Sequence, residues 1–183
     1  MKIDIRGLSE DQIIEFFKKK GFDSYRGRQV YEWIWKKSCY SFNEMTNISK
    51  DLRDVLDNHF VINHIQVDKI QKSFDGTIKN AVKLHDDHTV ESVLIPTDDR
   101  TTACVSSQVG CSLDCKFCAT SKLKRMRNLN PDEIYDQVVT INDQSKKYFN
   151  RPLSNIVYMG MGEPLMNYNN LIKSIEKISS DKG

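Results

Sequence analysis

Residues 111–118 read CSLDCKFC and space three cysteines as Cys-x3-Cys-x2-Cys. Three thiolates this close in one loop suit a shared metal centre. A closed structural zinc site uses four protein ligands, commonly as two separated Cys-x2-Cys pairs. A [4Fe–4S] cluster uses one thiolate per iron, so three cysteines leave one iron open for a bound molecule. The spacing therefore favours such a cluster over three unrelated core cysteines, with Phe117 shielding it.

The segments around this stretch predict parallel β/α units, because strand, loop and helix alternate along the chain. Asn130 and Pro131, followed by two acidic residues, are typical of a helix start. Apolar spacing predicts the elements in this order: a strand at residues 101–107, a helix from 130 to about 146, a strand at 154–159, a loop at 160–167 and a further helix through Leu171 and Ile178. Two such units cannot close a barrel, so we expect that the chain is truncated and that partner strands lie beyond it.

The residues before position 63 predict a small helical module. Ser9 and Gln12 form a capping box, and Ser49 can cap another helix. Apolar residues at helical spacing predict helices at 10–20, at 26–37 after a break at Gly27, and after Ser49. These short amphipathic helices are expected to bury their apolar faces against one another.

The residues from 63 to 97 predict a β-meander. Apolar residues alternate from His64, Asp75-Gly76 is a hairpin signal, and Pro96 stops the third strand. We therefore divide the chain into a helical module at 1–62, a meander at 63–97 and the first part of the β/α core at 98–183.

The amino-acid composition excludes several classes of protein. The 183 residues are 39% hydrophobic and 28% charged, which is typical of a globular protein and excludes collagen-like and disordered classes. No apolar run approaches the ~20 residues of a membrane span, and the N-terminus lacks an export signal, so we expect a cytoplasmic protein. An odd count of five cysteines argues against a disulfide framework and for metal or redox chemistry. The four histidines show no ligand spacing.

The net charge of +2 is too near zero to indicate a polyanion partner by itself. Residues 116–130 nevertheless hold five basic residues and no acid: Lys116, Lys122, Lys124, Arg125 and Arg127. This run could face phosphates, although a solvated face is the simpler interpretation.

A second motif, residues 160–164 with the sequence GMGEP, follows the second predicted parallel strand. Ligands of parallel sheets bind beyond the carboxyl ends of strands, so this loop and the cysteine loop are expected to share one site. Glycines let a backbone approach a ligand closely, and Glu163 could receive a cationic amine. S-adenosylmethionine (SAM) fits both loops, because its amino and carboxylate groups can chelate an open iron.

These motifs resemble the radical SAM superfamily, which shares the three-cysteine loop and the glycine-rich second strand. Their context resembles more narrowly the dual-specificity RNA adenine C2-methyltransferases, which act on large-subunit ribosomal RNA and on transfer RNA. The stretches that carry this resemblance are GCSLDCKFCAT at 110–120, Arg127-Asn128-Leu129, GMGEPLMN at 160–167, YRGRQV at 25–30 with Trp33-Ile34, Asp75-Gly76-Thr77 and ESVLIP at 91–96. They span nearly all of this chain, but only about the first half of a family member.

The resemblance implies an α/β fold in which the helical module and the meander precede the first units of a partial (β/α)6 radical-SAM barrel. It also implies the site residues. Cys111, Cys115 and Cys118 would hold the [4Fe–4S] cluster, and Gly162 with Glu163 would bind SAM.

The implied reaction has two stages. In the family, one SAM methylates a protein cysteine, and a second SAM yields the radical that abstracts hydrogen from that methyl group, whose carbon then adds to adenine C2. Glu91 matches the family's proton acceptor. Cys104 matches the resolving cysteine, which forms a disulfide with the methylated one as product leaves.

The implied partners are ribosomal RNA, transfer RNA and a reductant protein such as flavodoxin or ferredoxin, with no membrane contact and a monomeric protein. In the helical module, the residues that would contact phosphates are Arg26, Arg28, Lys36 and Lys37.

The sequence departs from the family at two points: the methyl-carrying cysteine would lie beyond Gly183, and Ser121 stands where many members have glycine. Cys39 is no substitute for the missing cysteine, because it belongs to the helical module. Three alternatives stay open: a C8-methylating relative, a glycyl-radical-enzyme activase, against which the long N-terminal portion argues, and a non-catalytic RNA-binding fragment.

Overall fold

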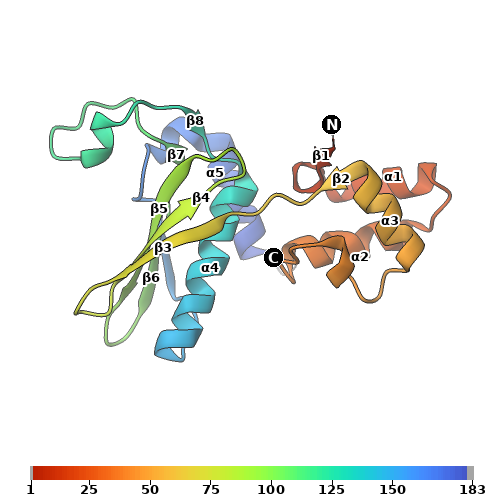
Figure 1. Ribbon diagram of the computed structural model, residues 1–183, viewed down its shortest axis with the longest axis horizontal. Coiled ribbons are helices and arrows are strands. Elements are labelled where there is room, and N and C mark those ends of the chain that lie inside the picture. The colour runs from red at the N-terminus through yellow and green to blue at the C-terminus, as the bar shows by residue number, and fades with distance from the viewer. Residues whose placement is uncertain (1, 181–183) are drawn as a thin grey trace. The chain divides into compact units, whose positions relative to one another are not determined.

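The computed structural model describes residues 2–180. These residues form two compact units, residues 2–63 together with 179–180, and residues 64–178 (Figure 1). The predicted third part extends to Gly183, and its residues 181–183 lie outside the described residues. None of the described helices is long and apolar enough to cross a membrane.

The first unit is the helical module. Its helices are α1 (Glu10–Lys19), α2 (Ser24–Trp35) and α3 (Lys50–His59), with two 3-10 turns at Ile5–Gly7 and Phe42–Glu44. Two short parallel strands, β1 (Ile3–Asp4) and β2 (Phe60–Val61), join its ends. The helices bury an apolar core that includes Ile5, Ile13, Phe17, Val30, Trp35, Met45, Leu52 and Leu56.

The helix starts follow the local sequence signals. The capping box of Ser9 and Gln12 is present at α1. Ser49 occupies the N-cap of α3, but its side chain makes no capping hydrogen bond. The prediction of a break at Gly27 is wrong, because Gly27 lies inside α2, where its bare backbone packs on Ile14 of α1.

Replacing Gly27 with alanine is expected to lower the free energy of unfolding of the first unit by about 2 kcal/mol, the cost of an overpacked contact. A Cβ atom there would lie 2.8 Å from the Ile14 Cα, which is backbone and cannot rotate away. Urea denaturation measures the change, and Gly7→Ala is the matched control, since a Cβ at Gly7 meets nothing within 4 Å. Equal stabilities for the two variants would contradict the prediction.

The second unit is built on a five-stranded sheet in the order β3-β4-β5-β6-β9. Strands β3 (Gln66–Lys72), β4 (Ile78–Lys83), β5 (Thr89–Pro96) and β6 (Thr101–Cys104) run antiparallel, and β9 (Asn155–Val157) pairs parallel with β6. The connection from β6 to β9 includes helix α4 (Pro131–Phe149), and helix α5 (Tyr168–Ser179) follows β9. The predicted α/β class, the meander and the parallel β/α connection are confirmed.

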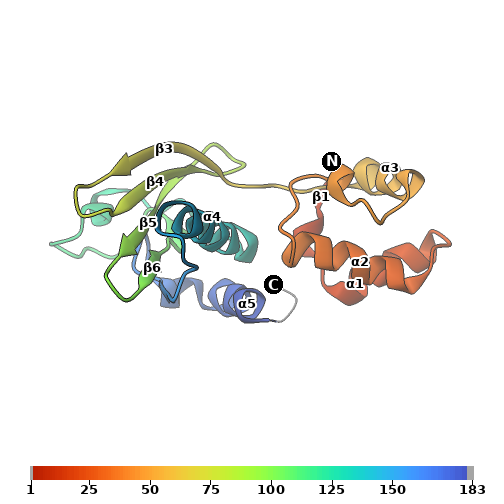
Figure 2. The same ribbon diagram turned by 90° about the horizontal axis from the view of Figure 1, so that it is seen from below.

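One face of the sheet is covered and the other is open. Helix α4 lies along the covered face, where Val82, Val90, Leu94 and Ala103 pack into the core with Ile134 and Ile141 (Figure 2). A reciprocal pair of buried amide hydrogen bonds, at 2.9 and 2.7 Å, links Asn80 of β4 to Gln144 of α4. Side chains of the alternate residues, including Lys79, Glu91 and Cys104, lie on the opposite face.

Candidate functional site

The cysteine loop leaves the core through β7 (Gln108–Val109) and returns through β8 (Arg127–Asn128). These two short strands pair antiparallel, and the loop projects beyond them (Figure 1). Gly110 closes the base of the loop with φ +72°, and a Cβ there would lie 2.2 Å from the Lys124 carbonyl oxygen. The loop base is therefore fixed by backbone contacts that only glycine allows.

The three predicted cluster cysteines all lie on this loop as free, half-buried thiols. The Cys118 N–H donates to the Cys115 carbonyl oxygen at 3.0 Å, which turns the chain between them. The structure does not bring the three sulfurs to one point: no three His, Cys, Asp or Glu residues within residues 2–180 form a group that could hold a metal ion. Phe117, predicted to shield the cluster, is 95% exposed.

The chemistry of the loop nevertheless fits a thiolate-bound cluster. The Leu113 N–H donates to the Cys111 Sγ at 3.5 Å. Hydrogen bonds from the Thr120 backbone and hydroxyl lower the pKa of the Cys118 thiol below its ordinary value. The Thr120 contacts favour the thiolate form of Cys118, and N–H donors to sulfur are a known influence on iron–sulfur clusters.

In the iron-free chain, Cys118 is expected to react with iodoacetamide faster than the other thiols, because the thiolate is the nucleophile. Burial raises the pKa of Cys104 above its ordinary value and that of Cys39 to about 12, so both should react slowly near neutral pH. Alkylation of each site is followed by peptide mass spectrometry between pH 6 and 9.

Thr120→Val removes the hydroxyl donor and should shift the alkylation profile of Cys118 to higher pH. Thr102→Val, on strand β6, is the control and should leave the profile in place. Cys118 reacting no faster than Cys39 would refute this assignment.

The second loop, residues 160–167, follows β9 and presses against the chain between β6 and β7. The Met161 carbonyl oxygen accepts from the Ser107 and Gln108 N–H groups at 2.9 and 3.2 Å. A Cβ at Gly160 would lie 2.8 Å from the Ser106 nitrogen, and one at Gly162, whose φ is +93°, would lie 2.4 Å from the Gln108 Cβ. The two predicted ligand loops are therefore side by side, as the sequence predicts.

Glu163 begins the 3-10 turn Pro164–Asn167. Its carboxylate accepts from the Leu165 N–H at 3.1 Å, and its own N–H donates to the Gln108 Oε1 at 2.9 Å. A half-exposed carboxylate held in this way can receive a cationic group.

Glu91 and Cys104 lie on the open face of neighbouring strands. Cys104 pairs with Val93, and Glu91 is two residues away on the same face of β5. The Glu91 carboxylate forms an exposed ion pair with the Lys79 Nζ at 3.0 Å. Its backbone carbonyl accepts from the Ser106 hydroxyl at 2.5 Å, close to where the cysteine loop begins.

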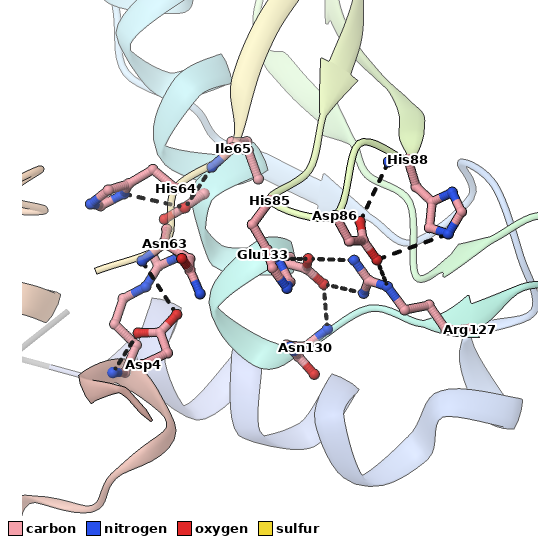
Figure 3. A network of polar contacts seen from close by, with 12 residues as sticks. Asp4, Asn63, His64, Ile65, His85, Asp86, His88, Arg127, Asn130 and Glu133 are labelled. Atoms are coloured by element: carbon pink, nitrogen blue, oxygen red, sulfur yellow. Dashed lines mark hydrogen bonds and ion pairs between the residues drawn. The ribbon is translucent and has the colours of Figure 1, made fainter. Parts of the chain in front are cut away.

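A polar network at the foot of the cysteine loop was not predicted from the sequence (Figure 3). Arg127 of β8 donates to both carboxylate oxygens of Glu133, at 2.7 and 2.8 Å, and to Asp86 at 2.6 Å. Glu133 also accepts from the Asn130 N–H, which completes the predicted cap of α4, and lies 3.2 Å from the His85 Nδ1. Within the basic run at 116–130, Arg127 therefore has a structural role. The other four basic residues are exposed: Lys116, Lys122, Lys124 and Arg125.

Two buried amides join the loops, and these contacts were also not predicted from the sequence. Asn167 donates to the Ser107 and Leu129 carbonyl oxygens at 2.9 and 2.8 Å. Gln108 donates to the Asn128 Oδ1 at 2.7 Å while accepting from Glu163. Their partners lie 20 to 60 residues away in the sequence, and local patterns give no signal of such pairs.

In the first unit, the predicted phosphate contacts are carried by α2 and the residues after it. Arg28, Lys36 and Lys37 are exposed, and the Lys37 Nζ lies 3.7 Å from the centre of the Trp33 ring. Arg26 is half-buried and donates to the Asn47 carbonyl oxygen at 3.0 Å. Cys39 is buried in the core of this unit.

Comparison with known proteins tests the resemblance. Residues 3–62 match the ribosomal RNA large subunit methyltransferase N-terminal domain, and residues 105–182 match the radical SAM superfamily. A probable dual-specificity RNA methyltransferase RlmN from Christiangramia forsetii is 70% identical over the whole chain. The chain is thus similar to RlmN proteins over its whole length, and to the radical SAM superfamily over residues 105–182.

Further relatives show the same similarity. The RlmN proteins of Flavobacterium psychrophilum and Desulfotalea psychrophila are 66% and 40% identical over the whole chain. The crystal structure of a radical SAM methyltransferase from Sphaerobacter thermophilus superposes with a TM-score of 0.85 and 33% identity over 99% of this chain, but 53% of its own. The chain likewise spans 52% of the Christiangramia relative, about half of its length.

Proposed function

We propose that this chain is the N-terminal half of a protein that methylates C2 of adenosine in large-subunit ribosomal RNA and in transfer RNA. The observation that carries the proposal is the cysteine loop lying beside the loop of Gly160 to Glu163, in a chain that is similar to RlmN proteins over its whole length. When bound, a [4Fe–4S] cluster and SAM supply the radical chemistry that a poorly nucleophilic carbon requires.

The residues of this chain have distinct proposed roles. Cys111, Cys115 and Cys118 hold the cluster as thiolates, and N–H groups of the same loop donate to the sulfurs of Cys111 and Cys118. The backbone at Gly162 lets the cofactor approach closely, and the Glu163 carboxylate receives its ammonium group.

Two residues of the open sheet face act on the RNA and on the product. The Glu91 carboxylate accepts the proton that leaves C2. The Cys104 thiolate attacks the sulfur of the methyl-carrying cysteine outside this chain. An S–S bond forms as the bond between that sulfur and the product carbon breaks, and the carbon keeps the electron pair and takes up a proton to become the methyl group. Their positions on one face of β5 and β6 support a joint role. The expected disulfide stays a prediction, since all five cysteines of this chain are free.

The proposal includes the partners and the compartment. Exposed basic residues on α2 and on the cysteine loop would contact RNA phosphates, and a reductant protein such as flavodoxin or ferredoxin would supply electrons. We further propose a monomeric protein that works in the cytoplasm, where thiols stay reduced.

The test is anaerobic reconstitution of this chain with iron and sulfide. We expect about four irons per chain and a reduced electron paramagnetic resonance (EPR) spectrum that SAM alters. Cys118→Ala should lose both, while Cys39→Ala, which removes the buried thiol of the first unit, should keep both. RNA binding by a chain that takes up only zinc, or whose cluster ignores SAM, would instead identify a non-catalytic RNA-binding fragment.

A further inference from the structure

Gln108 occupies the junction of the two ligand loops. Its side chain is fully buried, at 0% exposed, and both ends of its amide are used. The Nε2 donates to the Asn128 Oδ1 at 2.7 Å on the returning strand of the cysteine loop. The Oε1 accepts from the Glu163 N–H at 2.9 Å in the second loop.

The contacts around Gln108 leave little freedom for this amide. A Cβ at Gly162 would lie 2.4 Å from the Gln108 Cβ and 2.9 Å from its nitrogen, so the second loop rests directly on this residue. The Gln108 N–H also donates to the Met161 carbonyl oxygen at 3.2 Å. Any shift of Gln108 therefore displaces Gly162 and Glu163 together.

Asn128 extends the connection back to the second loop. Its Nδ2 donates to the Met166 carbonyl oxygen at 3.2 Å, and its Oδ1 also accepts from Arg125 at 2.9 Å. Two buried or half-buried amides thus bridge the loop that carries the cysteines and the loop that carries Glu163. Each amide has a donor and an acceptor aimed at different loops; an apolar side chain reproduces neither contact, and a carboxylate reproduces only the accepting one.

We infer that Gln108 is a positioning residue that fixes the distance between the cysteine loop and the Glu163 loop, and so sets the affinity for SAM. That these two loops hold the cluster and SAM rests on the proposed function. A molecule held at both loops binds tightly only if their separation is fixed before it arrives, because ordering the loops otherwise costs binding free energy. Gln108 touches neither the cysteines nor the carboxylate of Glu163 in the contacts described above, so it acts through its neighbours.

Gln108→Met, which keeps the length of the side chain but neither hydrogen bond, tests the inference. The reconstituted variant should keep about four irons and need roughly tenfold more SAM for half of the EPR change, a loss typical of one or two buried hydrogen bonds. Gln144→Met is the matched control, because it breaks the buried amide pair with Asn80 on the covered sheet face. It should reduce stability but leave the SAM titration unchanged.

A second pair of variants acts at a less buried position. Asn128→Leu removes the bridge, whereas Asn128→Asp keeps the oxygen that accepts from Gln108 and should restore most of the SAM affinity. An Asn128→Asp titration as weak as that of Asn128→Leu, or a Gln108→Met titration equal to the wild type, would overturn the inference.

Amide hydrogen exchange of the iron-free chain separates this inference from the proposed function, because it needs neither cluster nor SAM. Gln108→Met should speed exchange roughly tenfold in residues 160–166 and at the base of the cysteine loop, and Gln144→Met should not. Protection of both loops that survives Gln108→Met contradicts the positioning role even if the cluster forms. Lost protection in a chain that binds no cluster supports the role and refutes the proposed chemistry.

Discussion

Gly162→Ala is expected to lower the free energy of unfolding of the second unit by about 3 kcal/mol, from positive-φ strain and from overpacking. The residue has φ +93°, a region that side chains other than glycine rarely occupy, and the added Cβ would lie 2.4 Å from the Gln108 Cβ. Neither the strand-bound Gln108 nor the loop can yield without breaking the hydrogen bonds of Met161 and Glu163. We also expect the variant to lose the SAM-dependent EPR change.

Gly76→Ala provides the control for the backbone strain alone. It lies in the same unit with φ +85°, but its Cβ would meet only side-chain atoms, the nearest at 3.3 Å. Urea denaturation followed by circular dichroism compares the two variants. If both lose the same stability, crowding against Gln108 contributes nothing and the close approach of the two loops is not a constraint.

The parts of the fold that the sequence predicts are those set by local contacts. The capping boxes at Ser9 and Asn130 each join residues three apart, and both are present. The hairpin at Asp75-Gly76 and the stop at Pro96 also depend on neighbouring residues, and β3, β4 and β5 form as predicted.

The predicted strands 101–107 and 154–159 are longer than the strands observed, for a reason that is not local. Ser106 and Ser107 leave the sheet because their N–H groups bond to Gln137 of α4 and to Met161. Beyond the end of β9, the Gly160 N–H donates to the Val105 carbonyl oxygen at 3.0 Å, and the bare backbone of Gly160 packs on Ser106. Such constraints come from segments brought together by folding, so periodicity in one segment cannot reveal them.

In the candidate site, too, the sequence predicts features set by neighbouring residues and misses those set by contacts between distant segments. The cysteine spacing and the GMGEP motif are visible in the sequence because ligand-binding residues cluster within each loop. The residues that hold the loops together, Gln108, Asn167 and Arg127, pair across long sequence separations and carry no motif of their own. The sequence leaves the basic run around Arg127 facing either phosphates or solvent, because its two carboxylate partners, Glu133 and Asp86, cannot be known from local patterns.

Arg127→Met is expected to lower the free energy of unfolding of the second unit by about 3 kcal/mol at pH 7, since it leaves a buried carboxylate without its main partner. The Glu133 side chain is only 3% exposed and would keep only the Asn130 N–H and His85 from the contacts described above. The variant should also loosen the foot of the cysteine loop, because Arg127 is the residue of β8 that fixes it to the β4–β5 turn and to α4. Lys83→Met, which breaks the exposed ion pair with Asp87, is the control and should change stability little.

The pH dependence distinguishes loss of this network from simple loss of packing. The hydrogen bond from the Arg127 guanidinium is the main cause that lowers the pKa of Asp86 from 3.8 to about 2. Since the folded-state pKa is below the unfolded one, the pair stabilises the fold above about pH 4 and loses that stabilisation as the pH falls towards 2. Arg127→Met lacks this contribution at every pH, so its deficit against the wild type should shrink between pH 4 and pH 2. Urea denaturation at pH 7, 4 and 2.5 measures the deficit, and one that stays constant would mean that Arg127 acts through its packing rather than its charge.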